Sequence, residues 1–185
     1  MRFSHAAAVS LGILLATPAL AQGWTEFTQQ DLQFSINFPA TPAAQDTMFT
    51  TQRGTAVPAK LYSANTDTGR YSILVVDFTK QPWEQIGAID HAASLIRKKG
   101  KPRYDAAVDL DGIPGHTLSF DTPDGRYGMV AIYNFDGRLY LSEASVPRGS
   151  TPPSQFQQSI VIYDRGGRRV NLRPPNAPQP ERPAR

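Results

Sequence analysis

Cysteine is absent from the 185 residues, and histidine occurs only three times. The lack of cysteine excludes disulfides, thiolate metal sites and thiol nucleophiles. The chain also lacks the Gly-x-Ser-x-Gly elbow, the Ser-x-x-Lys pair, the phosphate-binding loop and the dinucleotide fingerprint. The sequence therefore gives no sign of the enzyme classes that these motifs mark. We expect a non-catalytic protein, and the sequence offers no catalytic, cofactor-binding or metal-ligating residue.

No apolar run is long enough to span a bilayer, which takes about 20 residues. One short apolar run, residues 6–16, follows Arg2 and precedes Ala19-Leu20-Ala21. This order is typical of a secretory signal with a small-x-small cleavage site. We therefore expect residues 1–21 to be a signal peptide, cleaved after Ala21. The mature protein would be periplasmic or secreted, with no transmembrane anchor.

Charge is distributed unevenly along the rest of the chain. Residues 22–164 carry 12 basic and 15 acidic side chains, whereas residues 165–185 carry six arginines and one acid. We expect a single domain over residues 22–164 and a disordered basic Pro/Arg-rich tail over residues 165–185. Because the domain has no basic excess, nucleic-acid binding is not expected. The tail is either a solvated end or a contact to an anionic envelope component.

The polar residues that invite a chemical interpretation form no complete site. His91 and His116 belong to no metal-binding spacing, and we expect structural or surface roles for both. Asp109 and Asp111 alternate as calcium ligands do, but the residues after them depart from the EF-hand pattern, and a hairpin turn explains them. A pair of acids suited to hydrolysis would leave no motif, so that alternative stays open.

Turn signals and the spacing of apolar residues together predict the secondary structure. Three Asp-Gly pairs divide the region 103–146 into four strands, because Asp-Gly favours tight hairpin turns, and an antiparallel meander follows. Apolar residues at three- and four-residue steps from Trp83 to Ile96 predict an amphipathic helix capped by Gly100. A second, short helix is expected to begin at Thr151. The expected strands are 24–28, 32–38, 46–51, 59–64, 71–79, 103–110, 113–121, 126–134 and 138–146.

The segment Phe34-Ser35-Ile36-Asn37-Phe38-Pro39, the order of elements and the late Phe156-Gln157-Gln158-Ser159-Ile160 resemble the PsbP/Mog1-like group, including small exported bacterial proteins. The resemblance covers about residues 24–164. It implies an α+β fold, with an antiparallel sheet of about six or more strands packed between helices as an α/β/α sandwich. The better-known members of the group are accessory or adaptor proteins, and no catalytic motif comes with the resemblance.

These observations together predict an exported accessory or protein-binding module without a cofactor. Its partner would be an envelope protein or an anionic envelope component. The alternative is a small-ligand or envelope-polymer binder with an aromatic-walled pocket between the sheet and a helix. A hydrolase with an unrecognised acid pair is the third possibility.

Overall fold

The computed structural model describes residues 23–173. The expected signal peptide and the last part of the expected tail, residues 174–185, lie outside the described residues. No helix within the described part is long and apolar enough to cross a membrane.

Strands dominate the described chain, and two α-helices interrupt them. The helices are α1 (Ala88–Arg97) and α2 (Ser154–Gln158), and short 3₁₀ turns cover Gln30–Leu32 and Pro82–Gln85. The strands are β1 (Thr25–Gln29), β2 (Phe34–Phe38), β3 (Ala43–Thr50), β4 (Ala56–Asn65), β5 (Arg70–Asp77), β6 (Lys101–Leu110), β7 (Ile113–Asp121), β8 (Arg126–Phe135), β9 (Arg138–Pro147) and β10 (Val161–Ile162).

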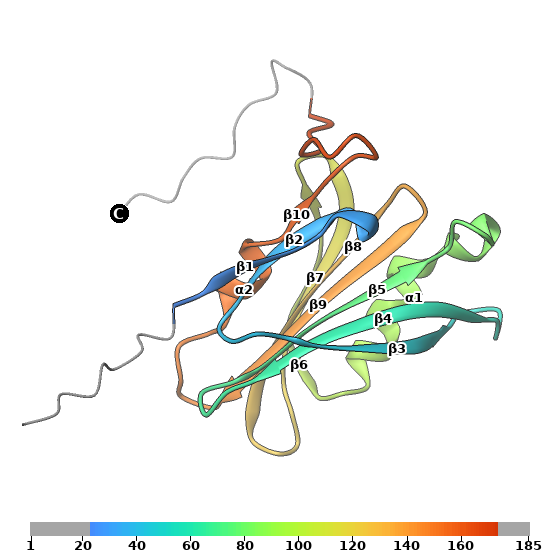
Figure 1. Cartoon of the computed structure of the whole chain (residues 1–185). Coiled ribbons are helices and arrows are strands. Elements are labelled where there is room, and N and C mark those ends of the chain that lie inside the picture. Colours follow the sequence, from blue (N-terminus) through green and yellow to red (C-terminus); the bar gives the residue numbers. More distant parts are fainter. Residues whose placement is uncertain (1–22, 174–185) are drawn as a thin grey trace, which may run out of the picture.

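Seven strands form one large antiparallel sheet in the order β3-β4-β5-β9-β8-β7-β6, and the other three form a small sheet in the order β1-β2-β10 (Figure 1). Strands β6 to β9 are sequential neighbours, so the predicted meander is confirmed, and β7 has the predicted bounds. In the Asp111-Gly112 and Asp136-Gly137 turns both residues have positive φ. That conformation matches the twist of paired strands, and Asp-Gly adopts it readily.

The large sheet is covered on both faces. Helix α1 packs against β7, β8 and β9 on one face, and α2 packs against β8 and β9 on the other. The predicted α+β fold is therefore confirmed. The layer opposite α1 consists mainly of the small sheet, because α2 has only five residues.

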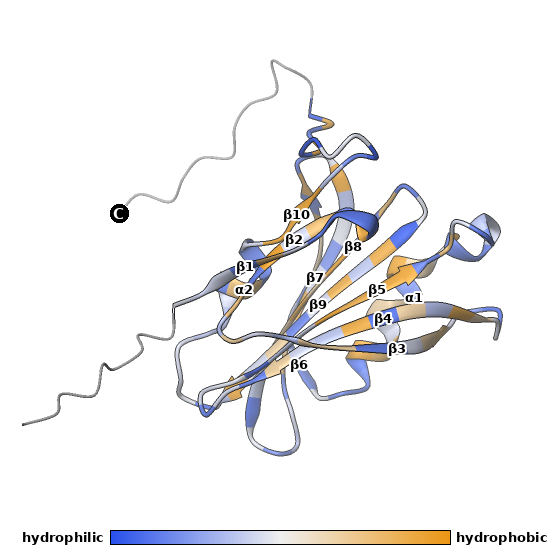
Figure 2. Cartoon of the chain, in the orientation of Figure 1, coloured by the Kyte–Doolittle hydropathy of each residue, from blue (hydrophilic) through white to orange (hydrophobic). Residues whose placement is uncertain are grey.

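The interior strand β5 is apolar on both sides because it separates two cores. Ile73 and Val75 face the core under the small sheet, whereas Val76 faces the core under α1. All three side chains are at most 1% exposed. Figure 2 shows the same concentration of apolar residues in β5, β8 and β9, with hydrophilic residues at the turns.

The first helix begins later than the periodicity indicates. Gly87 is left-handed and α1 starts at Ala88, so Trp83 and Ile86 lie outside the helix, whereas Ala93 and Ile96 are buried as expected. Gly100 has no positive φ and does not cap the helix. A Cβ at Gly100 would lie 2.1 Å from the carbonyl oxygen of Asp121, so close approach of β7 requires the glycine. Helix α2 begins at Ser154 rather than at Thr151, and no side chain caps it.

The ordered chain continues past the expected domain boundary at residue 164. Val170 is 7% exposed and belongs to the core under the small sheet. Its amide donates to the carbonyl of Ile162, and the amide of Leu172 donates to the carbonyl of Asp111. Residues 165–173 thus pack against the domain, where composition alone places them in a disordered tail.

Candidate functional site

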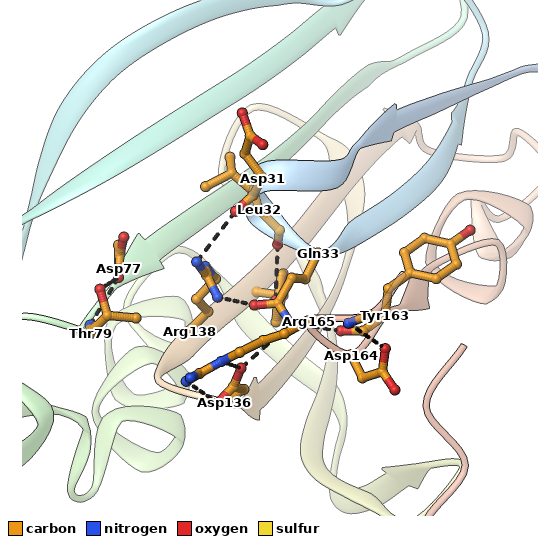
Figure 3. A network of polar contacts seen from close by, with 12 residues as sticks. Asp31, Leu32, Gln33, Asp77, Thr79, Asp136, Arg138, Tyr163, Asp164 and Arg165 are labelled. Carbon is orange, nitrogen blue, oxygen red and sulfur yellow. Dashed lines mark hydrogen bonds and ion pairs between the residues drawn. The ribbon is translucent and has the colours of Figure 1, made fainter. Parts of the chain in front are cut away.

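A network of polar side chains joins the small sheet to the β8–β9 turn (Figure 3). Gln33 lies at its centre, is 5% exposed and has the left-handed φ of 58°. Its side-chain amide donates to the carbonyl of Tyr163 at 3.1 Å and to Asp136 at 3.5 Å. The backbone carbonyl of Gln33 accepts from the amide of Tyr163, so this residue ties β2 to the chain after β10.

Arg138 completes the network from the first position of β9. Its guanidinium donates to the side-chain oxygen of Gln33 and, at 3.3 Å, to the carbonyl of Asp31. Its Nε is buried and has no hydrogen-bond partner among the described residues. Arg138 is also paired with Asp77 in the register of β5 and β9.

The carboxylates of this network are engaged as acceptors. Asp136 receives two hydrogen bonds of 2.7 Å from Arg165, and these lower the pKa of Asp136. Burial works to raise the pKa of Asp77, but hydrogen bonds from Thr79, together with the charges of Arg138 and Lys80, outweigh it, so the net shift is downward. Both groups are ionised at neutral pH, which suits them to hold neighbouring segments together and not to donate protons.

A polar surface groove of about 600 Å³ lies beside the network, lined by Thr28, Gln30, Asp31 and residues 163–167. The sequence-based alternative placed an aromatic-walled pocket between the sheet and a helix. The aromatic side chains instead pack on one another between the two sheets, with ring centroids 5.0 Å apart for Phe27 and Tyr62 and for Phe38 and Phe156.

Five tyrosines lie on β4, β5, β8 and β9, and most of them are buried. Tyr62, Tyr71, Tyr133 and Tyr140 are each at most 8% exposed, and Tyr140 is fully buried. The remaining one, Tyr127, is partly exposed, with the guanidinium of Arg103 stacked 5.5 Å from its ring centroid.

The arginines expected to form a solvated tail pair with carboxylates of the domain. Arg165 contacts Asp136, Arg169 contacts Asp111 at 2.8 Å and Arg173 contacts Asp109 at 2.9 Å. Arg168 contacts Asp164 at 3.0 Å. Asp111 and Asp136 occupy the Asp-Gly turns, so residues 163–173 form a strap across two neighbouring hairpin tips. Arg182 and Arg185 lie outside the described residues.

The two histidines lie apart. His91 on α1 has its Nε2 3.0 Å from the carbonyl of Thr50 and packs edge-on against Phe49. His116 on β7 has its Nε2 2.5 Å from Asp105, which also receives two hydrogen bonds from Arg97. The side chain of His116 is only 13% exposed, so it does not project outward. Arg97 first, and His116 second, hold the pKa of Asp105 far below its usual range.

The Asp109-x-Asp111 pair forms a turn with basic partners. Asp109 accepts from the backbone amide of Gly112 at 2.9 Å and also receives Arg173. Across residues 23–173 no group of three or more histidines and acids is arranged to hold a metal ion. Hydrogen bonds from Gly112 and then Arg173 lower the pKa of Asp109.

A different feature presents exposed apolar side chains at the segment between β5 and α1, which projects beyond the end of the sheet (Figure 1). We call residues 82–86 the Trp83 turn. Trp83 is 53% exposed and Ile86 is 68% exposed. Trp83 lies in the 3₁₀ turn, and Ile86 is the residue that ends it, with extended backbone. Sequence periodicity assigned both to the buried face of a helix.

Glu84 anchors the Trp83 turn to the loop after β3. It is 6% exposed, and its carboxylate accepts from the hydroxyl of Thr51 at 2.6 Å and from the hydroxyl of Thr55 at 2.9 Å. The hydrogen bond from Thr51 is the main cause that lowers the pKa of Glu84. A buried, charge-assisted anchor between two exposed apolar residues fixes their position before any partner arrives.

Comparison with protein-family models and with curated proteins finds no match. Among solved structures, the chain is similar to cyanobacterial PsbP (CyanoP) from Synechocystis, the group that the sequence motifs resemble. The similarity covers 83% of this chain and 99% of that chain, with 11% identity and a TM-score of 0.49. It concerns the fold alone and assigns no role to any residue of this chain.

Proposed function

We propose that this protein is an exported, non-catalytic accessory protein that docks a protein partner through the Trp83 turn. One observation carries the proposal: Trp83 and Ile86 are exposed on a turn that the buried Glu84 holds in place. Tryptophan is enriched among the residues that dominate binding energy at interfaces. Residues 1–16 and the Ala19-Leu20-Ala21 site support export.

The turn has the properties of a preorganised anchor. Binding loses less conformational entropy when the contact residues are already ordered, so a fixed turn gains affinity over a flexible one. Lys80 and Arg53 are both exposed, and Arg53 lies close enough to Glu84 to lower its pKa. The partner would therefore offer an apolar pocket with an acidic rim.

Cross-linking of the mature protein in living cells, followed by mass spectrometry, tests this function. We expect a reproducible protein partner whose capture falls at least tenfold in the variant W83A/I86A. A tryptophan buried at the centre of an interface commonly contributes roughly 2 kcal/mol or more to the binding free energy. The matched control is Met48→Ala on β3, which removes a side chain that is 56% exposed elsewhere.

Equal capture by W83A/I86A and M48A would reject the Trp83 turn as the docking surface. Glu84→Ala provides an independent check, because it keeps both apolar residues but removes the anchor. Partner binding should weaken in this variant through a faster dissociation rate. If the folded wild-type protein captures no partner at all, the accessory function itself is wrong.

A further inference from the structure

The charges of the domain are separated between the two ends of the large sheet. The strap, residues 163–173, lies at the end that carries the Asp111 and Asp136 turns (Figure 1). The opposite end consists of the chain after α1, the β4–β5 and β7–β8 turns and the start of the loop after β9. We call its seven cations the basic end: Arg70, Lys98, Lys99, Lys101, Arg103, Arg126 and Arg148.

Ion pairs and shared hollows link several residues of the basic end to one another. Arg103 and Arg148 share the carboxylate of Asp121, at 2.8 Å and 3.6 Å. Arg70, Lys99 and Arg126 line one hollow of about 340 Å³. Arg103 and Arg148 line a second hollow, of about 210 Å³, with Tyr127.

The basic end has more positive charge than its own acids neutralise. Asp121, Asp124 and Glu143 each pair with a cation of the group, and Asp67 is the one other acid on these segments. Among the described residues, Lys98, Lys101 and Arg126 form no ion pair with a carboxylate. Four acids against seven cations leave a formal charge of +3, although residues 22–164 as a whole carry −3.

We propose that the basic end binds the phosphate headgroups of an anionic membrane surface. Its cations stand on turns and strand ends, so several of them can reach a flat layer of phosphates together, and each contributes to attraction at such a surface. Tyr104 is 53% exposed beside them, and Tyr127 is stacked under Arg103. Amphipathic aromatic rings are favoured at the boundary between headgroups and water.

The surface proposed for lipid is distinct from the Trp83 turn. The exposed Trp83 and Ile86 suit an apolar pocket on a protein, whereas the exposed groups of the basic end are charged or amphipathic. The strap arginines are already paired with carboxylates, so they supply less free charge than the tail composition indicates. The membrane contact therefore does not depend on the protein partner.

Vesicle co-sedimentation of the full mature chain tests the proposal, with phosphatidylcholine vesicles that contain or lack phosphatidylglycerol. The test variant is K98Q/K101Q/R148Q. The matched control R53Q/K60Q/K80Q removes the same formal charge from exposed positions outside the basic end. At low salt we expect binding to the anionic vesicles to fall about 100-fold in the test variant, since each cation near the surface contributes roughly a fivefold factor.

The control variant should retain most of the binding, and added salt should weaken binding by every form because it screens exposed charges. Equal losses in the two triple variants would overturn the proposal, since net charge would then explain binding. Equal binding to vesicles without phosphatidylglycerol would also overturn it. So would loss of binding in a chain that ends at Arg173, because the segment after the strap would then carry the contact.

Two further outcomes separate other sources of the same chemistry. Displacement from vesicles by millimolar inorganic phosphate, beyond the effect of chloride at equal ionic strength, would assign the basic end to a free phosphate ligand. Failure to bind anionic vesicles, together with capture of an acidic protein that the test variant loses, would assign it to a protein. Either result overturns the membrane contact and leaves the test of the Trp83 turn unaffected.

Discussion

Gln33 is the residue at which three parts of the chain meet. Its side chain contacts Arg138 at the start of β9, Asp136 in the turn before it and the carbonyl of Tyr163 after β10. It holds this position with a left-handed backbone, a conformation that costs an L-residue about 1–2 kcal/mol. A non-glycine residue in this conformation leaves no sequence signal, so Gln33 could not be identified from the alternating pattern of β2.

Two substitutions at Gln33 separate the backbone cost from the side-chain contacts. Gln33→Ala and Gln33→Gly both remove the amide, but only alanine retains the left-handed strain. We expect Q33A to be less stable than wild type by about 2–3 kcal/mol. The free energy of unfolding of Q33G should be about 1 kcal/mol higher than that of Q33A, because glycine adopts positive φ freely. Urea unfolding measures both values, and equal stability of the two variants would contradict the strain.

At the scale of elements, the meander could be predicted from local turn signals. The turn before α1 and the path of the strap could not, because they depend on contacts between distant residues. Asp-Gly favours a tight turn through its own backbone preference, and in two of the three pairs both residues adopt the positive φ of that turn. The start of α1 follows instead from the left-handed Gly87, and the turn before it is held by the bond from Thr51 to Glu84, made across 33 positions of the chain. Composition likewise identifies a run of arginines but not Asp111, which lies 58 positions before its partner Arg169.

The strap gives a prediction at the same scale. A chain that ends at Asp164 loses the buried Val170 and the ion pairs to both hairpin tips, so its free energy of unfolding should fall by about 2–3 kcal/mol. A chain that ends at Arg173 keeps these contacts and should match the full mature chain. Thermal unfolding of the three forms checks this. Unchanged stability after truncation at Asp164 would show that the strap is not held in solution.

Over the whole molecule, the paired charges give one end a different character from the other. The acids at the hairpin tips form ion pairs with arginines of the strap. The basic end, in contrast, keeps cations that lack acid partners among the described residues. The Trp83 turn projects from a third place. Under the two proposals, this separation would let a small domain contact a membrane and a protein at once, without overlap between the two surfaces.

The ion pairs and hydrogen bonds of the carboxylates also set the response of the whole fold to acid. Eight carboxyl groups in the described part have lowered pKa values: Asp77, Glu84, Asp105, Asp109, Asp121, Asp124, Asp136 and Asp164. A carboxyl group whose pKa is lower in the folded state than its unfolded value of about 4 stabilises the fold fully at pH above about 4. That stability is lost as pH falls through the folded-state values. The free energy of unfolding should therefore be nearly constant from about pH 7 to 5 and fall steeply below about pH 4.

Asp105 provides the test of that acid response, because Arg97 of α1 and His116 of β7 both face it, and Asp90 is the one other acid whose charge acts on Arg97. Asp105→Asn should be less stable than wild type at neutral pH, and its stability should decline less steeply below about pH 4. The two curves then converge in acid.

Asp46→Asn, at a side chain that is 84% exposed, controls for the loss of one charge. Urea unfolding at a series of pH values would contradict the assignment if the D105N and wild-type curves stayed parallel into acid, since the pairing of Asp105 would then add nothing that depends on its ionisation.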